Sequence, residues 1–547
     1  MIGIEAAESV RPGRFRVRAR PASTPVRRAP LPLLLAGLGI AGLALLPIAY
    51  LVIRALGADP DSLDLVLRAR TLTVAASTVG LALFVGAGTI ALGVPLAWLT
   101  TRTDLPGRRA WAVLTVVPLA IPSYVTGFAF LAAFGPRGSL QSLLAPLGVE
   151  RLPSIGGLFG ATLVLVLVTY PYVVLATRAA ILRTDPAVED AARLLGDRRA
   201  TVFRRVTLPV LAPAIAAGAL LAILYALSDF GAVSLLQFDS FSRAIYVQYR
   251  ASFDRSLAAI LALMLVAMTL AVAWGETRVR RRAGAYATVG RTARRPVTVL
   301  PLGRWRWPAA VFCAAVVGIA LVVPAGTIGW WLVRGLAQGE PVRFVADAAL
   351  NSFLAGGGAA LMAVLLALPI GLLVARFPSR SSGLIEGATY TGYALPGIVI
   401  ALSVVFLATN ALPVLYQTLV LLVLAYAVRF LPQAVGTIRA ALVTVGPRVE
   451  EAGRTLGDGP ARAFLRLTVP LLRPSLVAGG ALVFLTVVKE LPMALLLGPI
   501  GFETLATRIW DAASEGFYAR AAAPAALLLV LSTATVALLL RSEDRVR

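Results

Sequence analysis

The chain has 547 residues, of which 59% are hydrophobic and 14% charged, and its formal net charge is +24. This composition is too apolar for an ordinary soluble protein and indicates a membrane protein. The arginines gather in a few segments, which argues against a nucleic-acid binder, while zero His and one Cys exclude histidine chemistry and an internal disulfide.

The first predicted segment, residues 1–30, is rich in Arg and Pro, and we expect a cytoplasmic tail there rather than a cleaved signal. Apolar runs follow that are long enough to span a bilayer, on the order of 20 residues each. Six of them form a first predicted transmembrane domain, residues 31–274. These runs lie near 31–54, 74–99, 111–134, 158–177, 209–231 and 256–274.

A basic segment without long apolar runs, residues 275–308, is predicted to be a cytoplasmic connector. A second predicted transmembrane domain, residues 309–541, and a cytoplasmic tail, residues 542–547, complete the chain. The six runs of this domain lie near 309–333, 350–375, 385–409, 412–436, 471–498 and 520–540. We therefore predict an all-α integral membrane protein with about 12 transmembrane helices.

Two polar segments, which we call the islands, interrupt the apolar sequence and are copies of one another. Pro186–Pro209 returns without a gap as Pro447–Pro470, at an offset of 447 − 186 = 261. The repeat extends further, because Ile121-Pro122 matches Leu395-Pro396 at an offset of 274. Six helices separate the copies, so we predict two parallel six-helix repeats related by an axis along the membrane normal.

Each island is predicted to form two short helices with a sharp break between them. Asp185 can cap the first helix of the first island. Gly196 and Gly457 allow the left-handed residue that ends a helix, and Asp197 and Asp458 can then cap the next one.

The first helix of the first island is expected to carry a docking surface. The spacing of Ala191, Leu194 and Leu195 puts small and apolar groups on one side of that helix. Such a surface is typical of a helix that docks into a groove of a partner.

The pattern E-A-A-x-x-x-G, followed by a basic helix and a Pro, resembles the cytoplasmic loop of the membrane subunits of binding-protein-dependent ABC importers. Asp190 replaces the usual Glu in the first island, and Gly453 replaces the second Ala in the other. In that family the loop is the coupling helix that seats in the ATPase subunit, so the resemblance implies ATPase docking by both islands. The implied coupling residues are Glu189, Asp190, Ala191, Ala192, Gly196, Asp197 and Pro209, and Glu450, Glu451, Ala452, Gly453, Gly457, Asp458 and Pro470.

The distribution of arginine predicts the orientation of the chain. If both termini are cytoplasmic, every dense Arg cluster and both islands also face the cytoplasm. The only lysine, Lys489, lies between Val488 and Glu490, so the chain cannot carry a Walker A site. We expect a transporter subunit without a cofactor, not an enzyme, with two copies of a separate ATPase.

Charged residues end the helix that follows each island. At the 261 offset, Ser228 and Asp229 take the positions of Lys489 and Glu490. Ionisable groups at membrane depth usually face a cavity or a partner, so these four are candidates for a translocation path or gate. We expect Lys489 to pair with Asp229 across the central axis; the alternative is that these helix ends lie in water at the outer interface.

The segments S-D-F-G-A and K-E-L-P-x-x-L-L-L resemble the two halves of fused ferric-iron importer permeases. This resemblance implies a type I ABC importer permease in a bacterial inner membrane, surrounded by lipid, with an extracytoplasmic binding protein as partner. Ferric iron is the implied ligand, although thiamine, phosphonate and polyamine importers share the architecture, and no metal site is assigned.

Two other classes of function remain open. A secondary transporter would explain twelve helices and an internal repeat but not two near-identical islands. An integral-membrane enzyme is disfavoured, because the chain has no His and its one Cys, Cys313, lies inside an apolar run.

Overall fold

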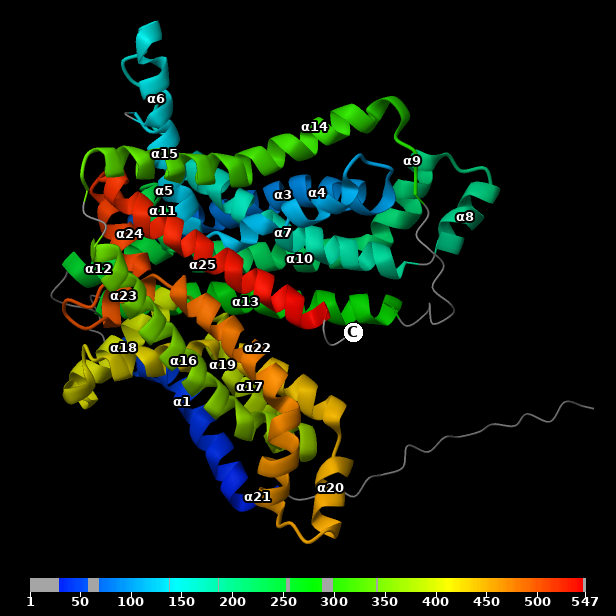
Figure 1. Ribbon diagram of the computed structural model, residues 1–547, viewed down its shortest axis with the longest axis vertical. Coiled ribbons are helices and arrows are strands. Elements are labelled where there is room, and N and C mark those ends of the chain that lie inside the picture. Colours follow the sequence, from blue (N-terminus) through cyan, green and yellow to red (C-terminus); the bar gives the residue numbers. More distant parts are fainter. Residues whose placement is uncertain are drawn as a thin grey trace, which may run out of the picture.

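The computed structural model describes residues 29–57, 68–136, 138–184, 186–251, 256–287, 299–340 and 343–544. Most of these residues are helical, which confirms the predicted all-α class. Figure 1 shows two groups of helices that meet at one end and diverge toward the other. The islands, marked by α8 and α20, lie at the diverging ends (Figure 1).

The first half of the chain contains six long or bent helical segments with short helices between them. The long segments are α1 (Leu31–Leu56), α3 (Ala69–Arg102), α4 (Arg108–Leu114) with η2 (Val117–Ala120) and α5 (Ser123–Phe134), α7 (Gly157–Arg183), α10 (Leu208–Ser228) and α13 (Ser256–Ala287). The short elements are α6 (Ser139–Leu144), α8 (Pro186–Leu194), α9 (Arg199–Val202), the π-turn η4 (Phe203–Thr207), α11 (Gly231–Leu235) and α12 (Phe241–Ala251).

The second half repeats this order. Its long segments are α14 (Arg306–Val317) with η6 (Gly318–Val322) and α15 (Val323–Ala337), α16 (Arg343–Arg376), α17 (Arg380–Ala394) with α18 (Gly397–Ala411), α19 (Leu419–Val445), α22 (Val469–Val488) and α25 (Tyr518–Asp544). The short elements are α20 (Arg448–Thr455), α21 (Pro460–Ala463), the π-turn η8 (Phe464–Thr468), α23 (Pro492–Leu497) and α24 (Leu505–Ser514).

Nine helices within the described ranges are long and apolar enough to span a bilayer. Two more segments qualify only as bent pairs, α4–α5 with a bend of 95° and α17–α18 with a bend of 105°. The twelfth predicted run falls on α25. All twelve predicted runs therefore coincide with helical segments, and those over 111–134 and 385–409 are each interrupted by a bend.

Proline explains where the two bent segments break. Pro122 and Pro396 are the residues immediately before α5 and α18, and the residues before them, Ile121 and Leu395, have extended backbone. A proline ring clashes with a helical conformation of the preceding residue. The helix must therefore stop at the same place in both halves.

Both halves are built around the same trio of packed helices. The trio is α3, α7 and α10 in the first half and α16, α19 and α22 in the second. Matching hydrogen bonds support the repeat: the Thr78 hydroxyl accepts from the amide of Phe241 at 3.0 Å, and the Ser352 hydroxyl accepts from that of Leu505 at 2.8 Å. The predicted internal repeat thus extends to tertiary contacts.

The first helix of each half packs against the opposite half. Helix α1 contacts α16, α17 and α18, while α15 contacts α5. Gly37 of α1 lies so close to α17 that a Cβ there would be 3.4 Å from Ile385. On the other side, the Trp331 indole donates to the carbonyl of Ala132 at 3.2 Å. The first helix of each half therefore packs against the opposite half.

Helix α13 continues to Ala287, so the first part of the predicted connector, residues 275–287, is helical. The end of the connector pairs with the chain that follows α3. The amide of Leu300 donates to the carbonyl of Arg102 at 2.7 Å, and the amide of Asp104 donates to Leu300 at 3.2 Å. The second half is thereby tied to the island end of α3.

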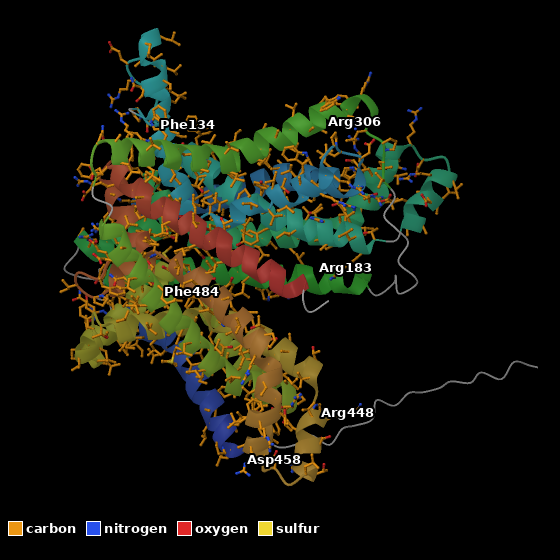
Figure 2. The ribbon with its side chains drawn as sticks, viewed as in Figure 1. Phe134, Arg183, Arg306, Arg448, Asp458 and Phe484 are labelled. Carbon is orange, nitrogen blue, oxygen red and sulfur yellow. The ribbon has the colours of Figure 1, made fainter. Side chains whose placement is uncertain are left out.

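Figure 2 places charged and apolar landmarks at opposite ends of the bundle. Arg183 and Arg306 lie at the island end of the first group of helices, and Arg448 and Asp458 lie at the island of the second. Phe134 lies at the opposite end (Figure 2).

The exchange of first helices can be tested by cross-linking. In a Cys313→Ala background, Gly37→Cys with Ile385→Cys should form a disulfide, because these positions are in van der Waals contact. After cleavage at a protease site inserted between residues 288 and 298, the two fragments should migrate together until they are reduced. Gly39→Cys with Ile385→Cys is the matched control, since a Cβ at Gly39 has nothing within 4 Å. Equal cross-linking of both pairs would contradict this packing.

Candidate functional site

The islands have the predicted break after their first helix. Gly196 and Gly457 have φ values of +94° and +97°, a left-handed conformation that favours glycine. In the first island, the amide of Asp197 donates to the carbonyl of Ala192 at 3.2 Å. The equivalent bond of the second island, from Asp458, is 3.1 Å long. These bonds satisfy carbonyls that a helix end would otherwise leave open.

The predicted cap by Asp458 is wrong. Gly459 is the N-cap residue immediately before α21, and no side-chain hydrogen bond caps that helix. The Asp458 carboxylate instead faces Arg466 at 3.9 Å. The suggested cap by Asp185 lies outside the described residues. Pro209 and Pro470 lie in the first turns of α10 and α22, directly after the π-turns η4 and η8.

Large apolar side chains point into solvent at the end of both island helices. Leu194 and Leu195 are 89% and 88% exposed, and Leu456 is 89% exposed. We call Leu194 and Leu195 the docking surface of the first island, and Leu456 the docking surface of the second. Exposed apolar side chains on a polar segment are candidates for contact with a partner.

Glu189 and Glu450 do not belong to the docking surface, because both point back into the bundle. Glu189 forms a buried ion pair with Arg102 and accepts from the Thr207 hydroxyl at 2.9 Å. Asp190, the next residue, is half-exposed and pairs with Arg193 of its own helix at 3.0 Å. The Arg193 guanidinium also lies 3.4 Å from Glu189, so it joins the buried carboxylate to the half-exposed one.

The second island repeats this arrangement at the same positions. Glu450 pairs with Arg376 at 3.1 Å and accepts from the Thr468 hydroxyl at 3.1 Å. Glu451 follows it, as Asp190 follows Glu189, and is partly exposed. The family resemblance implies that all these acids are coupling residues, whereas the structure separates buried from exposed members.

The glycine that departs from the expected island pattern has a packing reason. A Cβ at Gly453 would lie 2.5 Å from the side chain of Leu467. In the first island Ala192 holds the position of Gly453, and the smaller Val206 holds that of Leu467. Relative to the first island, the second therefore lacks a methyl group at Gly453 and has one more carbon at Leu467.

Four helix breaks meet where the two halves touch. These are the break before α5, the break before α11, the break before α18 and the break before α23. A Cβ at Gly231 would contact Tyr124 of α5 and would lie 3.3 Å from Leu491 of the other half. Lys489 reaches across the halves and donates to the carbonyl of Ala120 at 3.4 Å.

Asp229 and Glu490 occupy equivalent places at these breaks. The Asp229 carboxylate accepts from the amides of Ala232 and Val233 at 3.0 and 3.2 Å, and Glu490 accepts from the amide of Met493 at 3.2 Å. Each acid therefore caps the short helix that follows it. Both are less than a tenth exposed within the protein, so the alternative of solvated helix ends is wrong for the two acids.

The remaining partners of the two acids differ between the halves. Asp229 accepts from the Ser123 hydroxyl, whereas Glu490 pairs with the guanidinium of Arg429. At the repeat offsets, Ser123 corresponds to Gly397 and Arg429 to Val168. A Cβ at Gly397 would overlap both members of the Arg429–Glu490 pair. Glycine at that position is therefore what makes room for the arginine.

The expected ion pair between Lys489 and Asp229 is not formed. Lys489 contacts the carbonyl of Ala120, while Asp229 is held by the Ser123 hydroxyl and two backbone amides. Those donors already satisfy the carboxylate, so it needs no ammonium group in this conformation. Ser228 is the last residue of α10, directly before the break.

A separate cavity of about 580 Å³ lies between α15, α24 and α25. Its charged lining residues are Glu340, Glu503, Arg508, Asp511, Glu515 and Arg520. Burial, together with the nearby carboxylates of Glu503 and Glu515, raises the pKa of Asp511. Within the described ranges, no three His, Cys, Asp or Glu side chains are grouped so that they could hold a metal ion.

Comparison with known proteins identifies the family. The profile described as "Binding-protein-dependent transport system inner membrane component" matches residues 93–284 and 367–547. The chain is a member of that family. It is 32% identical over 502 residues to the Fe(3+)-transport system permease protein FbpB 2 of Haemophilus influenzae, which covers 91% of this chain and 95% of that protein.

Other relatives are similar to only part of this chain. A probable molybdenum ABC transporter permease protein of Haloferax volcanii is 34% identical over 235 residues, or 42% of this chain and 81% of that protein. The sulfate transport system permease protein CysW of Escherichia coli is 32% identical over 215 residues, or 37% and 70%. This inner membrane component is therefore a multi-pass membrane protein that carries the permease domain twice.

Several residues of this site are not among those that the sequence motifs assign. Arg102 and Arg376 correspond at an offset of 274, and Thr207 and Thr468 at 261, so a search for repeated polar residues would have found both pairs. Arg429 has no such signal, because its counterpart is a valine. Its role depends on the space left by a glycine from another helix.

The different partners of Asp229 and Glu490 can be tested by giving the second half the residues that the first half has at the equivalent positions. Arg429→Val should leave Glu490 buried without a counter-charge, a loss of about 3–5 kcal/mol. Gly397→Ser alone should clash with Arg429. In a Glu490→Asp background the double variant recreates the Ser123, Val168 and Asp229 arrangement, so its melting temperature in detergent should exceed that of either single variant.

The double-mutant cycle provides the coupling energy. Gly387→Ser is the matched control on the same bent segment, because a Cβ at Gly387 has nothing within 4 Å. Strictly additive losses from Gly397→Ser and Arg429→Val would show that the two positions do not share one space.

Proposed function

We propose that this inner membrane component is the permease subunit of an ATP-driven importer. The observation that carries the proposal is the exposed leucine at one equivalent position of each island, Leu195 and Leu456, which fits two copies of one partner. The partner proposed is an ABC ATPase, bound once at each island. The chain itself carries no Walker A sequence, so ATP hydrolysis would belong to that partner.

The proposed ligand is ferric iron, delivered by an extracytoplasmic binding protein. Similarity to the iron permease of Haemophilus influenzae extends over nearly the whole of both chains. The molybdenum and sulfate relatives match less than half of this chain. Whole-length similarity favours iron, and the central breaks with Asp229 and Glu490 are the proposed path or gate, as in transporters with discontinuous helices.

The proposed setting is a bacterial inner membrane with both termini and both islands in the cytoplasm. Arginine clusters lie at the island ends of the helices, which matches the positive-inside rule. The two repeats, residues 31–274 and 309–541, would then act as paired transport domains joined through the cytoplasmic connector.

Reconstitution tests the function and the ligand separately. The chain, its cognate ATPase and its cognate capture protein should together import radioactive ferric iron into proteoliposomes, and should stop when ATP is omitted. Failure of the ATPase to co-purify with the chain would overturn the importer assignment. Import of molybdate, sulfate or thiamine, with no binding of ferric iron by the capture protein, would overturn only the ligand.

Impermeant thiol labelling tests the proposed orientation. In the Cys313→Ala background, Arg291→Cys should react only from the cytoplasmic side and Gly138→Cys only from the outside. The expectation follows from the alternation of the membrane spans and the arginine clusters. Reaction of both cysteines from the same side would contradict the six-plus-six arrangement. Arg291 lies outside the described residues, so labelling is the direct measurement of its side.

A further inference from the structure

Each island is fastened to the membrane helices by an arginine, a glutamate and a threonine, which we call the brace. The first brace is Arg102, Glu189 and Thr207, and the second is Arg376, Glu450 and Thr468. Their members correspond at the same offsets that relate the two halves. A contact that occurs twice, in independent copies, is a feature of the architecture.

The brace joins three separate elements at one carboxylate. The arginine is the last residue of the long helix α3 or α16, and the glutamate belongs to the island helix α8 or α20. The threonine is the last residue of the π-turn η4 or η8, which leads directly into α10 or α22. Movement of the island helix therefore pulls on two long helices through a single side chain.

A second contact ties the first π-turn to α3. Phe203 packs edge-on against Trp98 with ring centroids 5.0 Å apart, and the Arg102 guanidinium lies over the Trp98 ring at 5.4 Å. A π-turn is a local departure from regular helix, and such departures are frequent at functional sites. The turn, the ring and the ion pair thus form one connected group beneath the docking surface.

Burial makes the brace a rigid link. The side chains of Arg102 and Glu189 are 3% and 4% exposed. A buried ion pair adds little net stability relative to apolar side chains, but removal of one partner leaves an uncompensated charge and is strongly unfavourable. The pair therefore resists separation when the island moves, which suits a mechanical connection.

We propose that Glu189 and Glu450 are positioning residues that transmit movement of the islands to α3 and α10 and to α16 and α22. This inference rests on the proposed function, because it requires an ATPase that moves the islands. It assigns ATPase contact to the docking surface and transmission to the brace. Adjacent residues of one short helix therefore carry different tasks.

The two braces are unequal. Arg376 also donates to the carbonyls of Leu442 and Gly446 at 3.0 and 2.7 Å, so it keeps two acceptors if Glu450 is neutralised. Within the described residues the Arg102 side chain donates to no backbone carbonyl, and its Nε has no hydrogen-bond partner. Loss of charge at Glu189 should therefore have the larger effect.

The test compares ligand imported per ATP hydrolysed in proteoliposomes containing the full chain, ATPase and loaded capture protein. Glu189→Gln should lower this ratio about tenfold, and Glu450→Gln about threefold, within the range of mutations along a coupling network. Co-purification of the ATPase and hydrolysis without capture protein should stay within about twofold of the parent. A merely structural role would instead lower assembly, hydrolysis and import together.

Two controls separate transmission from docking. Leu195→Asp with Leu456→Asp should reduce ATPase co-purification, because a carboxylate replaces an exposed apolar contact in each docking surface. Arg243→Gln removes an exposed ion pair elsewhere and should leave the ratio unchanged.

An unchanged ratio in the double variant Glu189→Gln with Glu450→Gln, in a parent that couples normally, would overturn the brace proposal. Joint loss of assembly and import in that variant would also overturn it, in favour of a structural role. Absence of ATPase binding or import in the parent would instead overturn the proposed function.

Discussion

Hydrogen bonding of the backbone in an apolar medium is the constraint on which this structure depends. A helix that crosses lipid satisfies its own amides and carbonyls, so it can be interrupted only where other groups replace those bonds. At the meeting point of the two halves, Asp229 and Glu490 supply acceptors for the helices that restart after each break. The breaks can therefore exist only inside the protein, where the halves cover them.

This constraint gives the two halves a common frame but leaves their chemistry free to diverge. Both acids cap a short helix, yet one is completed by the Ser123 hydroxyl and the other by the Arg429 guanidinium. The capping role uses one oxygen of each carboxylate, so the other oxygen can accept a different partner. Duplication thus preserved the break while the charges around it became asymmetric, with Arg429 and Lys489 both contributed by the second half.

The sequence predicts features that depend on neighbouring residues or on repetition. Helical segments follow from long apolar runs, the paired halves from the 261 and 274 offsets, and the island breaks from Gly196 and Gly457. It does not predict the exchange of α1 and α15, because lipid-compatible apolar surfaces do not specify which neighbour they meet. The Arg429–Glu490 pair escapes prediction for the related reason that it depends on the space above Gly397.

The periodicity of the α-helix lets one island helix contact a partner on one face and hold the ion pair with Arg102 on another. Successive residues of an α-helix turn by about 100°, so Leu194 lies about 140° around the axis from Glu189 and on the same side as Asp190. One face can therefore present leucine to a partner while the opposite face holds the carboxylate against Arg102. Because the faces are separate, the docking surface can adapt to its partner without disturbing the ion pair. That separation explains why the outward acid differs between the islands, Asp190 against Glu451, while the inward acid is glutamate in both.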